Sequence, residues 1–339
     1  MSVSTRSRRR LVLFAALVAA CVAVAVIAIV SGAQSGGAKH ASAGARGVLP
    51  AARAAHRAMV VYRVVDPHRP TGGGQVAIAP ADAPQHRSTL TSLTCDRVYF
   101  SASGRGVCLA RGKGFAAGYE ADLFGPDLTV RYRVSVDGIP SRARVSPDGR
   151  YATVTLFVSG DSYADAGSFS TRTTIIDLAR GRKIADLEDF EVMKGERQVT
   201  ATDRNFWGIT FARDSDRFYA TMATGGKTYL IAGSVGARTA HVIHDNVECP
   251  SLSPDGTRVA FKKRGPDRSR PWRLTVLDLE TMRETPLAET RSVDDQAEWL
   301  DDDRVLYGVD GAVWQVPADG SGQPRRYLAR AGSPAVVRW

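Results

Sequence analysis

A four-residue phrase, Ser-Pro-Asp-Gly, constrains this chain more than any other feature of its sequence. It occurs at residues 146–149 and again at 253–256, each time after a short apolar run and shortly before an arginine that opens a second one. Proline fixes φ at the first corner of a turn, aspartate can accept hydrogen bonds from nearby backbone N–H groups, and glycine adopts the positive φ that closes the turn. Each copy therefore predicts a β-hairpin.

Weaker copies of this turn indicate that the hairpin belongs to a repeat. In each copy an apolar residue precedes a polar turn, and an arginine opens the next strand. The arginines are Arg105, Arg150, Arg217, Arg258 and Arg304, separated by 45, 67, 41 and 46 residues. The stretches between them contain short runs rich in β-branched and aromatic residues, which are typical of strands. A period of about 40–45 residues with one insertion is typical of the four-stranded blades of a β-propeller.

The two ends of the body supply the pieces of one more blade. Residues 333–339 resemble the first strand of a blade, whereas residues 58–64 and 75–79 resemble the later strands of a blade that lacks its beginning. Pairing these segments would close the ring and leave no open sheet edge. We therefore expect an all-β fold, a six-bladed β-propeller over residues 58–339 whose last blade is closed by N-terminal and C-terminal strands.

These features resemble the TolB-type, WD-like propeller family in an extracytoplasmic bacterial form. The Ser-Pro-Asp-Gly hairpins, the third-strand pattern at residues 274–279 and the six blades carry the resemblance, which covers roughly residues 58–339. The resemblance implies a fold and no activity, because its motif is a turn. TolB has an additional N-terminal α/β domain for which this chain has no room. Neither the TolB partner nor any functional residue is therefore carried over.

The N-terminal segment has the features of a membrane anchor. Residues 11–30 contain no charged residue and are long enough to cross a bilayer as a helix. The basic tail at residues 1–10 predicts, by the positive-inside rule, a cytoplasmic N-terminus and export of the rest. Residues 31–57 are rich in Gly, Ala and Ser and predict a flexible linker. We expect a single-pass protein of the cell membrane with its propeller outside the cytoplasm.

Two other interpretations of this segment stay open. Residues 31–33, Ser-Gly-Ala, could form a small-residue cleavage site for signal peptidase. Residues 18–21 resemble a bacterial lipobox, but nine apolar residues follow Cys21, where a lipidated cysteine normally opens a polar tether. The length of the apolar run favours an uncleaved anchor, because secretory h-regions usually span about 7–15 residues.

The net charge of +10 does not indicate a nucleic-acid-binding protein. Residues 1–56 hold seven of the 45 Lys and Arg residues and no Asp or Glu, which leaves 38 basic against 35 acidic residues in the rest of the chain. A body so balanced has no basic stripe of the kind that a phosphate backbone requires.

An oxidising compartment would permit a disulfide bond among Cys95, Cys108 and Cys249. Cys95 and Cys108 are the nearest pair in the sequence, and we predict this disulfide. Placed on the two arms of one hairpin, they would be about three positions out of register, so the pairing would require a β-bulge. One cysteine is then left over.

Loops on one face of the propeller are the candidate binding surface. In an antiparallel blade, the second-to-third loops and the links between blades lie opposite the Ser-Pro-Asp-Gly turns. Two long excursions, residues 158–171 and 188–206, are of these kinds, and we expect them to meet near the axis beside residues 291–296. The candidate ligand-binding residues are Asp161, Ser162, Tyr163, Asn205, Phe206, Trp207, Asp294, Asp295 and Gln296.

No catalytic residue, metal ligand or cofactor is assigned from the sequence. Gly160-Asp161-Ser162 resembles the nucleophile block of GDSL hydrolases, but the Asp-x-x-His of that family is missing and a serine nucleophile needs a base. His241 and His244 are three apart in a predicted strand, so they should point to opposite faces and make a poor metal pair.

The leading functional interpretation is a membrane-anchored, extracytoplasmic propeller that binds a protein or cell-envelope ligand through its loop-rich face, and no nucleic acid. The alternative is an enzyme on the same scaffold. It would be a hydrolase or lyase that uses loop carboxylates such as Asp294 and Asp295, with or without a metal ion.

Overall fold

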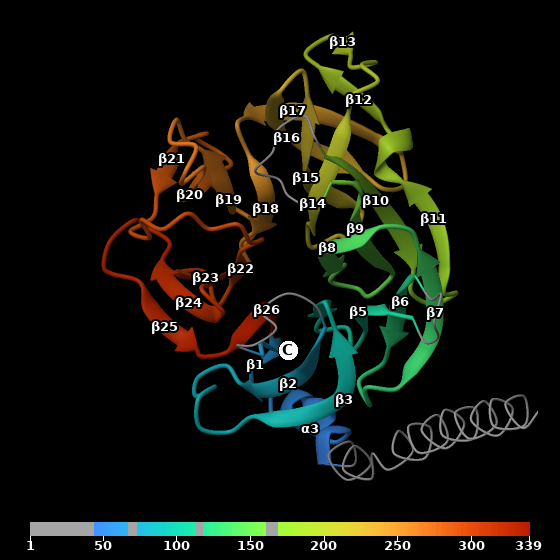
Figure 1. Ribbon diagram of the computed structural model, residues 1–339, viewed down its shortest axis with the longest axis vertical. Coiled ribbons are helices and arrows are strands. Elements are labelled where there is room, and N and C mark those ends of the chain that lie inside the picture. Colours follow the sequence, from blue (N-terminus) through green and yellow to red (C-terminus); the bar gives the residue numbers. More distant parts are fainter. Residues whose placement is uncertain (1–43, 67–72, 113–117, 161–168) are drawn as a thin grey trace, which may run out of the picture. The chain divides into compact units, whose positions relative to one another are not determined.

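Six β-sheets form a ring around a central axis in the computed structural model, which describes residues 44–66, 73–112, 118–160 and 169–339 (Figure 1). Five of the sheets have four strands and one has six, and each sheet is one blade. The strands of a blade follow one another along the chain with two exceptions. The two outermost strands of the third blade precede its other four, and in the sixth blade the last strand of the chain pairs with the first. The predicted six-bladed propeller is confirmed.

From the axis outward, the strands of each blade follow a fixed order. The first blade contains β4 (Arg97–Phe100), β5 (Gly106–Arg111), β6 (Tyr119–Phe124) and β7 (Val130–Val136), and the second contains β8 (Ile139–Val145), β9 (Tyr151–Ser159), β10 (Ser170–Asp177) and β11 (Arg182–Asp186). The third contains β14 (Asn205–Phe211), β15 (Arg217–Thr224), β16 (Lys227–Ser234), β17 (Thr239–Asp245), β12 (Glu191–Lys194) and β13 (Arg197–Gln198). The fourth contains β18 (Glu248–Leu252), β19 (Arg258–Arg264), β20 (Trp272–Asp278) and β21 (Glu284–Pro286). The fifth contains β22 (Glu298–Trp299), β23 (Arg304–Val309), β24 (Ala312–Pro317) and β25 (Arg325–Leu328), and the sixth contains β26 (Ala331–Val337), β1 (Met59–Val64), β2 (Gly74–Pro80) and β3 (Thr89–Cys95).

The Ser-Pro-Asp-Gly turn forms through the bonds that its residue types predict. In the fourth blade the carboxylate of Asp255 accepts the Ser253 hydroxyl and the Thr257 N–H, and Gly256 closes the turn with φ +79°. Burial would raise the pKa of Asp255, but these hydrogen bonds outweigh it and lower the pKa to about 2. The second blade repeats the arrangement, with Gly149 at φ +70°. Local chemistry therefore fixes both hairpins.

These turns also bond to one another around one face, which we call the turn face. Each contact joins the first-to-second-strand turn of one blade to that of the next, so the turns couple blades one to five. The bonds run from Arg105 to the Gly149 carbonyl, from the Asp148 N–H to the Ser215 hydroxyl, from Arg213 to the Pro254 carbonyl, and from the Asp255 N–H to the Asp302 carboxylate.

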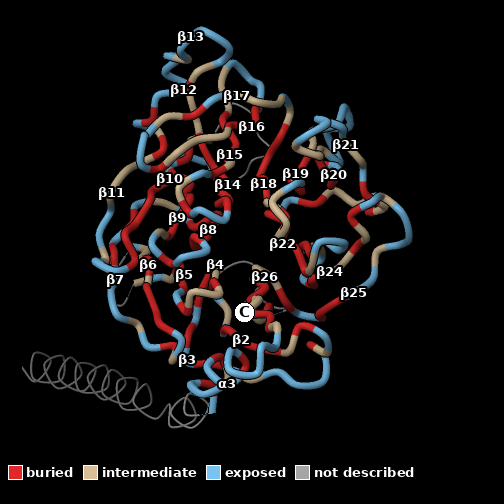
Figure 2. Tube along the Cα trace, turned by 180° about the vertical axis from the view of Figure 1, so that it is seen from behind, coloured by how far each residue is buried: buried red, intermediate tan, exposed pale blue. Residues whose placement is uncertain are grey.

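Apolar side chains fill the spaces between neighbouring blades. The middle strands are buried on both sides, as in β9, where six consecutive residues are buried, because every blade is covered by two others. One cluster joins Val107 and Leu109 of the first blade to Val154 and Ile176 of the second. In Figure 2 the buried segments run through the strands, and exposed residues gather in the turns and loops.

Ring closure depends on the pairing of β26 with β1. Met59, Val60 and Val61 lie opposite Val337, Val336 and Ala335 in antiparallel register. Four of these six residues are fully buried, at 0% exposure, and the other two are 4% and 6% exposed. The predicted closure of the last blade by strands from both ends is confirmed.

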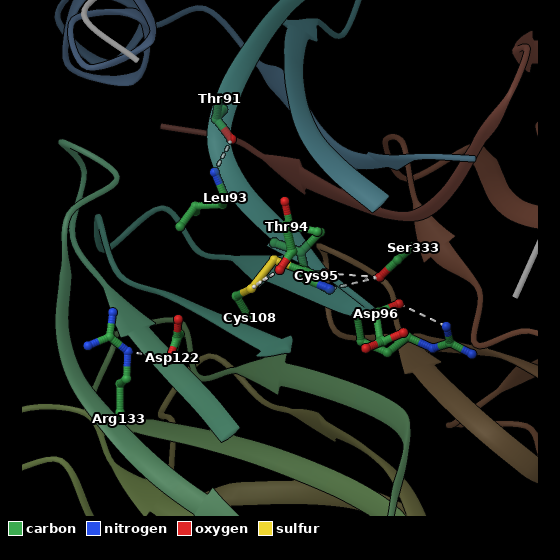
Figure 3. Close-up of a disulfide and its surroundings, with 11 residues drawn as sticks. Thr91, Leu93, Thr94, Cys95, Asp96, Cys108, Asp122, Arg133 and Ser333 are labelled. Carbon is green, nitrogen blue, oxygen red and sulfur yellow. Dashed lines mark hydrogen bonds and ion pairs between the residues drawn. A yellow bond between two sulfur atoms is a disulfide. The ribbon is translucent and has the colours of Figure 1, made fainter. Parts of the chain in front are cut away.

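The predicted disulfide is present, but it joins different elements from those expected. Cys95 ends β3, the outermost strand of the sixth blade, and Cys108 lies in β5 of the first blade, with the two Cα atoms 5.4 Å apart (Figure 3). The two cysteines therefore do not share a hairpin, and no bulge is needed between them. The bond ties the closing blade to its neighbour. Cys249 is buried among aromatic side chains.

The last part of the predicted flexible linker is a helix in the structure. Residues 48–54 form helix α3 (Val48–Ala54), which packs on the core with Leu49 and Ala52, while Arg53 stacks over the ring of Trp339 at 5.5 Å. Ala45, Leu49 and Ala52 follow helical spacing on one face, a signal that the Gly- and Ala-rich composition hides. The helix leads directly to the start of β1, at the turn face.

The long excursion at residues 188–206 was expected near the axis; its last residues lie there, at the start of β14, but the rest does not. It begins with the 3-10 helix η1 (Leu187–Asp189), and β12 then pairs in parallel with β17 at the outer edge of the third blade. Val192 and Phe190 are buried in the core between the second and third blades, which holds the segment outward. The expectation was wrong because the apolar residues of this insertion find their core at the periphery.

No helix among the described residues has the length and hydropathy needed to cross a membrane. Residues 1–43, which include the predicted anchor, lie outside the described part of the chain.

The disulfide predicts a measurable contribution to stability. Replacing both Cys95 and Cys108 with alanine should lower the free energy of unfolding by roughly 3 kcal/mol, because the crosslink restricts the unfolded chain over a loop of 13 residues. Guanidinium chloride unfolding would measure the change. Reductant should weaken the wild type by a similar amount and leave the double variant unaffected; an equal response of both proteins would contradict the assignment.

Candidate ligand-binding face

Charged side chains from four blades converge where the inner strands begin, on the face opposite the turn face. We call this the loop-rich face, because the links between blades and the second-to-third loops lie there. Arg97 opens β4, Arg142 lies in β8, Glu248 opens β18, and Asp294 precedes β22. Lys262, near the end of β19, completes the group.

Asp294 is the centre of this charged group. Its Oδ1 accepts hydrogen bonds from Lys262 Nζ at 2.6 Å and from Arg142 Nη2 at 3.3 Å. The Asp294 side chain is 42% exposed, whereas those of Lys262 and Arg142 are only 1% and 6% exposed. Burial would raise the pKa of Asp294, but the two cations outweigh it and hold the pKa below its usual range. The ionised carboxylate of Asp294 therefore faces solvent, and the two cations that hold it in place are buried beneath it.

A second carboxylate lies deeper in the fourth blade. Glu248 is fully buried, pairs with Arg264 at 3.0 Å, and lies 3.8 Å from Lys262 Nζ. The ring of Trp272 lies between the two cations, with its centroid 4.0 Å from Lys262 Nζ and 5.4 Å from the Arg264 guanidinium carbon. Burial would lower the pKa of Lys262, but Asp294, Cys249 and Glu248 raise it above its ordinary value. Lys262 is therefore held charged.

Arg97 adds a further cation at the axis. Its guanidinium donates to the carbonyl oxygens of Ser141 at 2.6 Å and Asp96 at 2.9 Å. Burial and the neighbouring Arg142 lower its pKa, while Asp295 and Asp96 oppose this shift. Two arginines from adjacent blades are thus held close together beside the carboxylates.

The three predicted residues at 294–296 have different roles. Asp294 belongs to the charged group described above. Asp295 accepts the N–H groups of Gln296 and Gly308, and the Gln296 side chain donates to the carbonyls of Ile209 and Pro250. Gln296 is 6% exposed and bridges three blades, so it positions the link and presents no free group to a ligand.

The three predicted residues at 205–207 are mostly buried. Phe206 and Trp207 are 0% and 1% exposed and belong to the interblade cores, so they are not exposed aromatic side chains, and their contact with a ligand stays a prediction. They open β14, whose pairing with β15 turns both aromatic rings inward. Asn205 is partly exposed, and its Oδ1 accepts the Thr171 N–H.

A hollow of about 310 Å³ opens beside Asn205 on the loop-rich face. Trp207 forms part of its wall together with Phe169, and the two rings meet edge to face at 5.5 Å. The predicted segment 205–207 therefore does border a cavity. Its contribution is the side-chain amide of Asn205 and the edge of the buried Trp207 ring. The other predicted residues, Asp161, Ser162 and Tyr163, lie outside the described residues.

Perturbed carboxyl groups can mark catalytic sites, and Glu188 is the clearest case. Its two oxygens lie 3.0 and 3.2 Å from the Thr173 N–H, and burial raises its pKa to about 8. It lies between blades two and three and supports β10, so its role is structural. Within the described ranges, no group of three or more His, Cys, Asp and Glu side chains is arranged to hold a metal ion.

Sequence reasoning missed the cations of this site. Arg142 and Lys262 were missed, and so was the carboxylate of Glu248. Arg142 lies within a strand of mostly small residues, Lys262 directly follows the apolar run at residues 259–261, and Glu248 opens a strand. A charge in the middle of a buried strand is costly unless it is paired, which was the available signal. Their partners lie in other blades, so the pairing itself could not be read from the sequence.

Comparison with known proteins addresses the fold. No protein-family model and no curated protein matches the sequence. Among solved structures, TolB from Acinetobacter baumannii matches with a TM-score of 0.57 at 14% identity, covering 82% of this chain and 66% of TolB, slightly under two thirds of its length. The fold is that of a TolB-like propeller. A chain of a nidogen–laminin complex matches with a TM-score of 0.55 at 9% identity, over 82% of this chain and 98% of that one.

The charged group of the TolB-like propeller predicts a large effect of Lys262→Met on stability. Methionine fills similar space but leaves buried Glu248 and Asp294 each with one cation fewer, which should cost about 3 kcal/mol of unfolding free energy. The neighbouring Lys263→Met is the control, because Lys263 is 38% exposed and its pair with Glu284 should contribute less than about 1 kcal/mol. Equal effects of the two variants in chemical denaturation would contradict this account.

Glu188 predicts a pH dependence of stability. Its carboxyl group stays protonated in the folded TolB-like propeller up to about pH 8, whereas the unfolded chain releases the proton near 4.5. The folded state therefore binds more protons in this range, and stability should fall as pH rises from 4.5 to 8. Glu188→Gln should flatten this slope and raise the melting temperature at the alkaline end; parallel wild-type and variant profiles would refute it.

Proposed function

We propose that this TolB-like propeller is an extracytoplasmic binding module, held at the cell membrane by its N-terminal segment, that binds a protein or cell-envelope ligand through the loop-rich face. The observation that carries the proposal is Asp294. Its ionised carboxylate is fixed by two buried cations and still open to solvent. Charges that are held in place before binding lose little freedom on association and select partners of complementary charge.

The way the chain enters the propeller supports this choice of face. Helix α3 packs at the turn face, where Arg53 lies over the ring of Trp339. The chain therefore enters the described propeller at the turn face, at the opposite end of the blades from the loop-rich face.

The disulfide between Cys95 and Cys108 supports the location outside the cytoplasm. Disulfide bonds persist in oxidising compartments and are rare in the cytosol. Precedent for protein binding by a propeller of this shape comes from the nidogen–laminin complex, in which the similar chain is part of an assembly.

The same geometry disfavours an enzyme that uses Asp294 as a proton donor. Lys262 and Arg142 lower the pKa of Asp294, so its carboxyl group has no proton to give near neutral pH. Asp295, the other loop carboxylate, is committed to two backbone N–H groups.

Site-specific photo-crosslinking on intact cells tests the proposal. Val158 lies at the loop-rich end of β9 and is 43% exposed, and Met282 lies on the turn face and is 40% exposed, so they form a matched pair. A photoreactive residue at position 158 should capture a partner that position 282 does not. Capture from position 282 alone, or from neither position, would refute binding of a protein partner through the loop-rich face.

A further inference from the structure

Two adjoining hollows form an elongated groove on the loop-rich face, beside the charged group at the axis. The first is the hollow of about 310 Å³ next to Asn205, and the second, of about 530 Å³, continues it toward Pro266. They share Gly226, Lys227, Thr228 and Arg264, so the tip of the β15–β16 hairpin lies between them. Such a shape suits an extended ligand that crosses the hairpin.

Two cations lie at this crossing point, Arg264, which pairs with Glu248 at 3.0 Å, and Lys227. The Lys227 side chain is exposed and takes part in no ion pair within the described part of the chain. The nearby carboxylate of Asp203 is already used, because its oxygens accept the Thr224 hydroxyl at 2.6 Å and the Gly225 N–H at 2.7 Å. These bonds lower the pKa of Asp203 and hold the hairpin tip in place. Asp203 therefore stays ionised and positions the hairpin backbone, and Lys227 is the exposed cation at the tip that is available to an anionic group.

The walls of the groove offer hydroxyl groups and an aromatic ring. Ser170, Thr202 and Thr228 line it, and the half-buried ring of Phe169 is backed by Trp207. A sugar ring presents hydroxyl groups at its edge and apolar C–H groups on its face. Side-chain hydroxyls and an aromatic ring are complementary to both.

A peptide that adds as a strand is less well suited to this groove. β15 pairs with β14 on one side and with β16 on the other, and β16 pairs in turn with β17. The hairpin therefore offers no open edge to an incoming backbone, which is what strand addition requires.

We propose that the two hollows form a subsite for an acidic glycan, with a uronic carboxylate bound at Lys227 and the neighbouring sugars lying in the hollows on either side. This inference rests on the proposed function and names the class of envelope ligand that the loop-rich face takes. It adds Lys227, Thr228 and Phe169 to the binding surface.

Isothermal titration of the full-length protein in detergent tests the subsite with three probes of equal length. A hyaluronan octasaccharide carries alternating glucuronate, N-acetyl-chitooctaose is a matched neutral glycan, and octaglutamate is an acidic peptide. The hyaluronan octasaccharide should bind most tightly. Lys227→Met should weaken that binding about tenfold, the loss expected for one charge-assisted hydrogen bond. The matched control is Lys183→Met, at an exposed lysine of β11, which should leave the affinity unchanged.

Each other outcome overturns the subsite. Equal binding of the neutral glycan would remove the role of the carboxylate, preferred binding of octaglutamate would make the ligand a peptide, and no binding of any probe would leave the groove without this ligand class. An unchanged affinity in Lys227→Met, with its melting temperature also unchanged, would exclude this lysine. If position 158 still captures a partner in cells while hyaluronan fails to bind, the glycan subsite is refuted and the proposed binding module is supported. If hyaluronan binds as expected while position 158 captures nothing, the glycan subsite stands and a protein ligand of the loop-rich face is excluded.

Discussion

The pairing of β26 with β1 is the contact on which the rest of the structure depends. A propeller blade is covered by its neighbours, so an open ring would expose the apolar faces of two blades and a row of unpaired backbone groups. The antiparallel pairing of residues 59–61 with residues 335–337 prevents this exposure. It joins the first and the last strand of the propeller, which are far apart in the sequence. Two further contacts support the same junction. The Ser333 hydroxyl accepts the Val98 N–H across to the first blade, and the disulfide joins the same two blades at a greater distance from the axis (Figure 3).

A closed ring gives the molecule two faces with different chemistry. On the turn face, aspartate and serine side chains are used within the hairpins and between neighbouring turns, so the charges there hold the blades together. On the loop-rich face, Lys262 and Arg142 are buried near the axis and Arg97 is half-buried, and burial of such groups is tolerated only because carboxylates and carbonyl oxygens surround them. The ring fixes these cations, which in turn fix Asp294. The arrangement of charges on this face is therefore a property of the closed ring as a whole.

Much of the fold could be predicted because its signals are local. The turns at residues 146–149 and 253–256 depend on residues within six positions of one another, and the strand runs between them recur at a regular period. The pairing of Cys95 with Cys108 was also predicted, but their positions in two neighbouring blades were not. The two cysteines are close in the sequence, and they were therefore assigned to the two strands of one hairpin. Helix α3 was missed for a related reason. Its two buried residues are Leu49 and Ala52, and buried Ala45 precedes it, which gives little signal until a core is present to receive them.

The sequence by itself determined the six blades, the closure by both ends and the face that carries the links, since turn chemistry and strand period act over short stretches of chain. It also placed Asp294 on that face. Only the tertiary structure decided which side chains meet there. Phe206 and Trp207 turned inward because β14 packs between two other blades, and the insertion after β11 moved to the periphery because its apolar residues are buried there. The charged group at Asp294 draws on Arg142 and Lys262, 152 and 32 residues away, and these side chains meet only when their blades have packed around the axis.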